Sequence, residues 1–241
     1  MGLIRKLGKL VVFLMVLELV MVIHEYGHFT EMRKMNIEVE EFSLGIGPVL
    51  YQHHAPGYTF SIRAIPVMAY VAPSKKGGEK IEKELSRFER FFIYSAGVRN
   101  NILSAVFVAV MFQLLAVARG YISFGYFWRM LLLLPPDLLF LFLASFVDLL
   151  SFNKIRLYHQ PVMTGGIIPP KSLRLFMMIS VLLGVWNSAP FVPLDGSKIF
   201  LDILPLFVSP GAVARYASFS FYIFIFYLFA AGRGIKFFEF E

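Results

Sequence analysis

The chain has 241 residues, of which 58% are hydrophobic and only 16% are charged. A water-soluble domain has about a quarter of its residues charged, so this composition argues against one. The absence of cysteine excludes a disulfide framework, a thiolate metal site and a cysteine nucleophile, so any metal must be held by His, Asp or Glu. The net charge is +7, but the Lys and Arg residues mostly flank apolar runs. We therefore expect contact with a lipid bilayer and no nucleic-acid partner.

The first apolar run, residues 7–30, has the length of a membrane-crossing helix and ends in a charged group at Glu31, Arg33 and Lys34. Its basic start is similar to that of a signal peptide, but no small-residue cleavage site follows. We interpret it as a retained transmembrane helix.

Residues 37–72 change to a strand-like pattern, because β-branched and aromatic residues alternate with polar ones. The Pro56–Gly57 pair is typical of a turn. This pattern predicts a small sheet or hairpin that is partly inserted in the membrane. A charged linker, residues 73–90, follows it and leads into a second span.

The first span ends in the motif HEYGH, which contains His24, Glu25 and His28. On an α-helix, positions i and i+4 share a face, so both imidazoles can bind one zinc ion while Glu25 acts as general base. Three ionisable residues in a membrane helix are costly unless they serve a site. The alternative is a pair of interfacial histidines at a helix end.

A zinc site needs a third protein ligand, and Asp195 in NSAPFVPLDGS is the best candidate. It follows an apolar run and lies among the helix breakers Pro190, Pro193 and Gly196. A buried carboxylate there is costly alone but well matched to a cation. The alternative is an interfacial Asp that caps the next helix.

Three segments of the sequence resemble the signature regions of the site-2 proteases, the zinc intramembrane peptidases. They are HEYGH, AGVRNN at Ala96–Asn101 and NSAPFVPLDG at Asn187–Gly196. The stretch from Glu40 to Val71 is similar to the membrane-reentrant β-loop of the bacterial regulator-of-sigma-E branch. The resemblance implies a three-helix catalytic core, zinc bound by His24, His28 and Asp195, and a transmembrane-helix protein as substrate.

Asn101 and Asn187 match family asparagines that help to position substrate near the site, so the resemblance implies a substrate-binding role for both. The alternative is hydrogen bonding between helices.

The sequence departs from the family pattern at Val98, at Met68 and Ala69, and at Ser197, none of which is a proposed ligand. Residues 119–172 are also too few and too apolar for the PDZ modules of longer relatives. A separate sensing or adaptor protein is a candidate partner in their place.

For Asp195 to meet the two histidines, the chain between them must cross the membrane an even number of times. Residues 121–150 are interrupted at Pro135 and Pro136, and we therefore expect a re-entrant or interfacial hairpin there. The basic residues after the first span and in the charged linker place the active site toward the cytoplasmic side of a prokaryotic cytoplasmic membrane.

We thus expect an all-α polytopic membrane protein with a small membrane-associated β-region, organised as one membrane-embedded peptidase domain. Its expected parts are the first core helix at 7–30, the β-loop at 37–72, the charged linker at 73–90, the second core helix at 91–118, the hairpin at 121–150, the third core helix at 173–204 and a C-terminal span at 216–232. The expected activity is hydrolysis of peptide bonds within transmembrane segments. The alternatives are another type of membrane zinc peptidase and a catalytically silent scaffold with the same fold.

Overall fold

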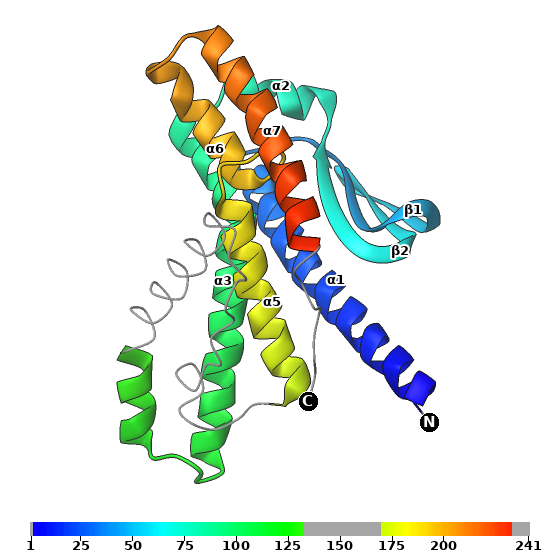
Figure 1. The fold of residues 1–241 in the computed structure, drawn as a ribbon, viewed down its shortest axis with the longest axis vertical. Coiled ribbons are helices and arrows are strands. Elements are labelled where there is room, and N and C mark those ends of the chain that lie inside the picture. The colour runs from blue at the N-terminus through cyan, green and yellow to red at the C-terminus, as the bar shows by residue number, and fades with distance from the viewer. Residues whose placement is uncertain (1, 133–169, 233–241) are drawn as a thin grey trace.

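The computed structural model describes residues 2–132 and 170–232. It is mostly helical with one two-stranded antiparallel sheet (Figure 1), which confirms these parts of the expected fold. The elements in chain order are α1 (Gly2–Lys34), β1 (Val39–Ala55), β2 (Tyr58–Pro73), α2 (Lys75–Lys83), α3 (Arg87–Ala118), α5 (Lys171–Ser188), α6 (Asp195–Ile203), a 3-10 turn (Leu204–Leu206) and α7 (Pro210–Gly232). Residues 124–132 are also helical.

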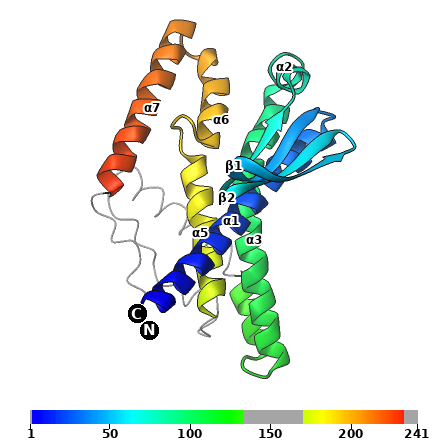
Figure 2. The same ribbon diagram turned by 90° about the vertical axis from the view of Figure 1, so that its right-hand side faces the viewer.

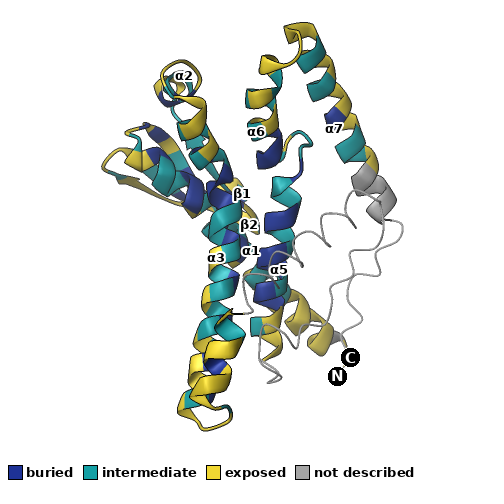
Figure 3. Ribbon diagram, turned by 90° about the vertical axis from the view of Figure 1, so that its left-hand side faces the viewer, coloured by how far each residue is buried: buried dark blue, intermediate teal, exposed yellow. Residues whose placement is uncertain are grey.

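Helices α1, α3 and α5 pack around a shared apolar core, where the buried residues concentrate (Figure 3). Small residues allow the close approach of α1 and α3: Ala105 and Ala109 are fully buried, and a Cβ on Gly27 would lie 2.5 Å from the carbonyl oxygen of Ala96. The buried members of this core are Val20, Ala105, Ala109, Leu175, Phe176, Met177, Ile179, Val181, Val185 and Ala189.

The outer faces of α1 and α3 are apolar and exposed. Within these helices, Ile4–Lys34 and Arg87–Ala118 are long and apolar enough to cross a membrane. Met15 is 66% exposed and Phe107 is 65% exposed. Apolar area of this extent is unfavourable in water but well placed against hydrocarbon, so the two helices have the surface of membrane-crossing segments.

Strands β1 and β2 form a hairpin that closes at Pro56 and Gly57, as expected, and projects from one side of α1 (Figure 2). The register shifts along β1 near Gly45 and Gly47, whose φ angles of 79° and 88° suit glycine.

As a result of these shifts, residues 41–44 lie opposite 69–72 and also opposite 59–62, which themselves pair with 51–54. Residues 59–62 are therefore enclosed between two neighbours. Residues 69–72 pair on one side only among the strands that the structure describes.

The charged stretch that follows the hairpin contains the short helix α2. The side chain of Ser74 caps α2 by accepting a hydrogen bond from the backbone N–H of Gly77. Helix α3 then starts with a capping box, in which the Ser86 side chain accepts from the Glu89 backbone and the Ser86 backbone donates to the Glu89 carboxylate. These two caps fix where α3 begins and so where its buried face lies.

Residues 133–169 lie outside the described part of the chain. Most of the expected hairpin at 121–150 falls there, as does the loop that follows it. The predicted number of membrane crossings between α3 and α5 therefore stays a prediction.

Two charged side chains fix the bent part of the sheet. The Arg63 guanidinium donates to the Glu41 carboxylate at 2.8 Å, and the Tyr70 hydroxyl donates to the same carboxylate at 2.6 Å. Arg63 also donates to the Ser43 hydroxyl and to the Gly47 carbonyl. The ion pair of Glu41 and Arg63 and its hydrogen bonds thus join the start of β1, the bend at Gly45 and Gly47, and β2 at both Arg63 and Tyr70.

Replacing Glu41 by Gln is expected to loosen this hairpin. Burial raises the pKa of Glu41, but hydrogen bonds from neighbouring side chains and the Arg63 charge outweigh it and lower the pKa below 4.5. The stabilisation is therefore complete at neutral pH and is lost as the pH falls through the lowered pKa. We expect Glu41→Gln to cost about 1 kcal/mol at neutral pH and to weaken the acid dependence. Faster amide hydrogen exchange in residues 39–44 and 69–73 would measure the effect.

The matched control is Lys83→Gln, which removes the ion pair between Lys83 and Glu79. The side chain of Lys83 is 69% exposed and that of Glu79 is 52% exposed. Exposed pairs contribute little, so exchange in the hairpin should stay as in the wild type. Equal exchange in wild type and Glu41→Gln would contradict a stabilising role for the partly buried pair of Glu41 and Arg63.

Candidate metal centre

Two imidazoles from one face of α1 form the first half of the site. His24 and His28 are one helical turn apart and are 2% and 6% exposed. Their ring centroids are 5.1 Å apart, and their Nε2 atoms are separated by 3.3 Å. The (i, i+4) spacing therefore brings both rings to one point, as the sequence predicts.

The carboxylate of Asp195 approaches this point from a break between two helices. Helix α5 ends at Ser188, and Asp195 is the first residue of α6. The third core helix, expected as a broken helix over residues 173–204, is two helices with a short link, residues 189–194, between them. Gly196 packs so closely that a Cβ there would lie 2.2 Å from the Ser188 carbonyl oxygen, so a side chain at this position would push the start of α6 away from the end of α5.

Helix α7 holds the same link from its other side. The Tyr216 hydroxyl donates to the carbonyl of Pro190, and the backbone N–H of Val192 donates to the hydroxyl of Ser220 at 3.4 Å. The position of the carboxylate therefore depends on three helices.

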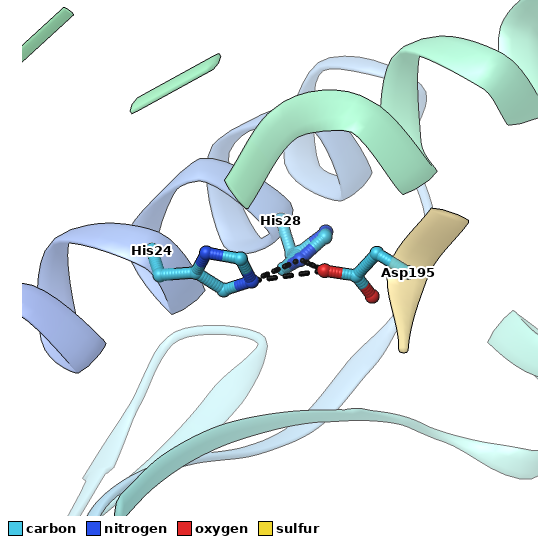
Figure 4. Close-up of side chains that lie close together, drawn as sticks. All are labelled: His24, His28 and Asp195. Carbon is cyan, nitrogen blue, oxygen red and sulfur yellow. Dashed lines mark hydrogen bonds and ion pairs between the residues drawn. The ribbon is translucent and has the colours of Figure 1, made fainter. Parts of the chain in front are cut away.

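The three side chains converge as Figure 4 shows. Oδ2 of Asp195 lies 2.9 Å from Nε2 of His24 and 2.9 Å from Nε2 of His28. Ligand atoms bound to zinc at about 2.0–2.2 Å lie roughly 3.3–3.6 Å apart in a tetrahedron. The two Nε2 atoms and Oδ2 need to move apart only slightly to reach this spacing. His24, His28 and Asp195 could therefore hold a zinc ion.

Helix α3 forms a wall behind both histidines. His28 donates from Nδ1 to the Ile93 carbonyl at 2.8 Å, and because a carbonyl can only accept, the lone pair of the neutral ring lies on Nε2. His24 lies against Gly97, where a Cβ would be 2.4 Å from its Nε2. A side chain at position 97 would displace the ring from the site.

The second oxygen of Asp195 has a separate partner. Lys198, one turn further along α6, donates to Oδ1 at 2.8 Å, and its side chain is 51% exposed. The lysine thus occupies Oδ1 and leaves Oδ2 toward the histidines. Because this side chain is half-exposed, we call the side of the site on which Lys198 lies the open side.

Glu25 follows His24 directly and is half-buried. Its charge interacts with His24, His28, Asp195 and Lys198, which places the carboxyl beside the ligand cluster. None of the hydrogen bonds among the described residues uses its carboxylate, so that group is free to accept a proton.

The two asparagines expected to bind substrate lie in different surroundings. Asn101 is fully buried on α3, with its amide 3.1 Å from Nδ1 of His24. Asn187 is half-buried on α5 and donates to the Leu183 carbonyl of its own helix at 3.0 Å. The structure brings Asn101, but not Asn187, into contact with a candidate ligand.

The sequence analysis did not predict three groups that contact the candidate ligands: Lys198, Gly97 and the Ile93 carbonyl. A signal existed for Lys198, which is three residues after Asp195 on a helix and therefore on its face. A weaker signal existed for Gly97, which lies one turn before Asn101. The Ile93 carbonyl has no sequence signal, because every residue carries one.

The model of peptidase family M50 matches residues 12–231 of the chain. Relatives include proteins of Pasteurella multocida (36% identical over 103 residues), Fusobacterium nucleatum (36% over 93) and Synechocystis (35% over 103). Each carries the provisional name of a zinc metalloprotease. The matches cover 39%, 37% and 39% of this chain but only 23%, 27% and 28% of the respective relatives, so the chain matches about a quarter of each relative's length.

The relatives' names agree with the donor set found here, two imidazoles and one carboxylate around a single point. The resemblance to site-2 proteases is thereby confirmed, and zinc is the cofactor that the family and the site have in common. A family model that matches nearly the whole chain shows that this protein belongs to peptidase family M50, the site-2 proteases.

Proposed function

We propose that the protein is an intramembrane zinc metalloprotease that hydrolyses peptide bonds within transmembrane segments of other membrane proteins. The observation that carries this proposal is the buried cluster of His24, His28 and Asp195 on a helix whose outer surface is apolar. A water-soluble peptidase has no need of such a helix beside its metal ligands.

The depth of the site supports cleavage inside the bilayer. His24 lies ten residues before Lys34, the last residue of α1, and at about 1.5 Å per residue this is roughly 15 Å along the helix axis. The basic residues Arg33 and Lys34 suit a membrane surface. The ligands then lie below that surface, within reach of a substrate helix that enters from the lipid.

The chemistry divides between the metal and Glu25. A bound zinc ion supplies Lewis acidity, which makes water more acidic and polarises a carbonyl. Glu25, beside the ligands and without a hydrogen-bond partner among the described residues, accepts a proton from the attacking water and returns it to the leaving amide nitrogen. Lys198 holds Asp195 in place on the open side, where the substrate bond would enter.

A transmembrane helix buries its peptide bonds in its own hydrogen bonds, so the substrate must unwind before cleavage. Residues 69–72 of β2 offer backbone groups on their second side, whereas 59–62 are paired on both sides. Strand β2 also packs against α1, which carries the ligands. We assign 69–72 as the edge that binds the unwound segment by β-addition.

The wider setting follows from the same assignment. The protein would be multi-pass, with its active site toward the cytoplasmic side, because the basic residues that follow α1 and precede α3 favour that side. Its partners would be a transmembrane-helix substrate and a separate sensing or adaptor protein. Asn187 lies close in sequence to the link before Asp195 and is the candidate substrate contact on α5.

Replacing Glu25 by Gln should abolish proteolysis while zinc stays bound. Loss of a general base costs about 10²- to 10⁴-fold in rate, and an amide cannot take the proton. Cleavage of transmembrane-helix reporters by purified protein in detergent, with metal content measured on the same samples, checks this. Glu31→Gln, six residues later on α1, is the control and should keep activity. Undiminished cleavage by Glu25→Gln would refute the assigned role.

Replacing Asp195 by Ala should release zinc, because two histidines alone leave a tetrahedral site incomplete. We expect at least about tenfold weaker affinity in competition with a chelator. Asp202→Ala is the matched control: it removes a carboxylate of the same helix that pairs with Arg90 at 2.7 Å, away from the ligands. If Asp195→Ala kept wild-type affinity, the third ligand would lie elsewhere, as in another type of membrane zinc peptidase.

The edge-strand assignment can be tested by disulfide trapping, since the chain has no cysteine. A single cysteine at Ala72 should cross-link to a reporter with one cysteine near its cleavage site. A cysteine at Gln52, which pairs with Ser61 on the opposite border of the sheet, should not. Equal cross-linking at both positions would count against substrate binding at 69–72.

A further inference from the structure

Asn101 contacts a candidate metal ligand and not the open side of the site. Its side chain is fully buried on α3, and its amide nitrogen lies 3.1 Å from Nδ1 of His24. Its amide oxygen is also buried and has no hydrogen-bond partner within residues 2–132 and 170–232. A buried amide with one satisfied and one orphaned end is costly, so this arrangement calls for an explanation.

The tautomer of His24 supplies the explanation. In the structure the Asn101 amide nitrogen faces Nδ1 of His24 and donates a hydrogen bond to it. The proton of the neutral ring is then on Nε2, which donates to the Asp195 carboxylate. A ring in this form has no lone pair on Nε2 for a metal. Zinc binding through Nε2 requires the proton on Nδ1, and the group that faces Nδ1 must then be an acceptor.

A half-turn of the amide about its terminal bond meets this requirement. The oxygen and nitrogen of an asparagine amide have nearly the same shape, so turning the group exchanges donor for acceptor without moving the backbone. The amide oxygen then accepts from the Nδ1–H of His24, and the amide nitrogen moves to the position in which the oxygen had no partner. His28 already has the corresponding arrangement, since its Nδ1 donates to the Ile93 carbonyl, also on α3.

We propose that Asn101 is a positioning residue, whose amide oxygen accepts the Nδ1–H of His24 and thereby orients the Nε2 lone pair toward zinc. Helix α3 then provides one acceptor for each histidine: a backbone carbonyl at Ile93 for His28 and a side-chain amide at Asn101 for His24. The two orientations of the amide correspond to the metal-free and the zinc-bound ring. This role differs from the substrate contact that the family resemblance implies for Asn101.

The inference rests on the zinc site of the proposed function but not on the cleavage reaction, so zinc affinity is the measurement. Three variants of the full-length protein in detergent are compared with wild type by competition with a zinc chelator. Asn101→Leu removes the acceptor at similar volume and should bind zinc about 10- to 100-fold more weakly. Asn101→Asp restores an acceptor and should stay within a few-fold of wild type.

Asn100→Leu is the matched control, because the neighbouring Asn100 donates to the Ile23 carbonyl at 3.2 Å and so bonds α3 to α1 without touching a ligand. It should bind zinc as the wild type does. Wild-type affinity in Asn101→Leu would overturn the inference, and so would an equal loss in both Leu variants, which would indicate helix packing alone.

A spectroscopic measurement covers the case in which Asn101→Leu does not fold. Nitrogen NMR of protein labelled in its five histidines should show His24 protonated on Nδ1 in zinc-loaded wild type and in zinc-loaded Asn101→Asp. An unprotonated Nδ1 at His24 in the zinc-loaded wild type would also overturn the inference. Zinc affinity that depends on Asn101, in a protein that cleaves no transmembrane reporter, would refute the proposed function and leave this inference standing.

Discussion

The burial of the Asp195 carboxylate between apolar helices is the constraint on which the rest of the site depends. Removing a carboxylate from water costs several kcal/mol unless charge and hydrogen bonds compensate it. Here His24 and His28 contact Oδ2, and Lys198 contacts Oδ1. A bound zinc ion adds the opposite charge that the buried group needs. The groups that compensate the buried carboxylate are therefore the same imidazoles that would share a metal ion with it.

Close backbone contacts set this geometry, and glycine permits each of them. Gly27 lets α1 and α3 cross beside His28, Gly97 leaves room for the His24 ring, and Gly196 lets the start of α6 pack on the end of α5. Helices that cross a bilayer gain little hydrophobic energy from contact with one another, so in the proposed membrane protein such close packing is a main source of helix association. The same contacts that hold the helices together thus position the ligands.

The sheet serves the site by a different kind of constraint. Its register is interrupted at Gly45 and Gly47, and the ion pair between Glu41 and Arg63 fixes the bend that results. The bend encloses residues 59–62 and leaves 69–72 as a border of the sheet. The alternation in the sequence predicted strands at 37–72 correctly, because period-2 patterning reflects one buried face. It could not predict which strand is an edge, because pairing partners far apart in sequence decide that.

The sequence by itself determined where the candidate ligands and the candidate base lie on α1: an α-helix has a fixed period, so HEYGH places two imidazoles on one face with a carboxylate beside them. It also determined that Asp195 needs a partner, because an apolar run with helix breakers predicts a buried and irregular turn. The same breakers predicted an interrupted third core helix, but only the tertiary structure decided that the interruption spans residues 189–194, that Lys198 occupies one oxygen of Asp195, and that Asn101 faces His24. These features depend on how α1, α3 and α5 cross, and a crossing is set by packing contacts between residues far apart in the chain, which local patterns do not encode.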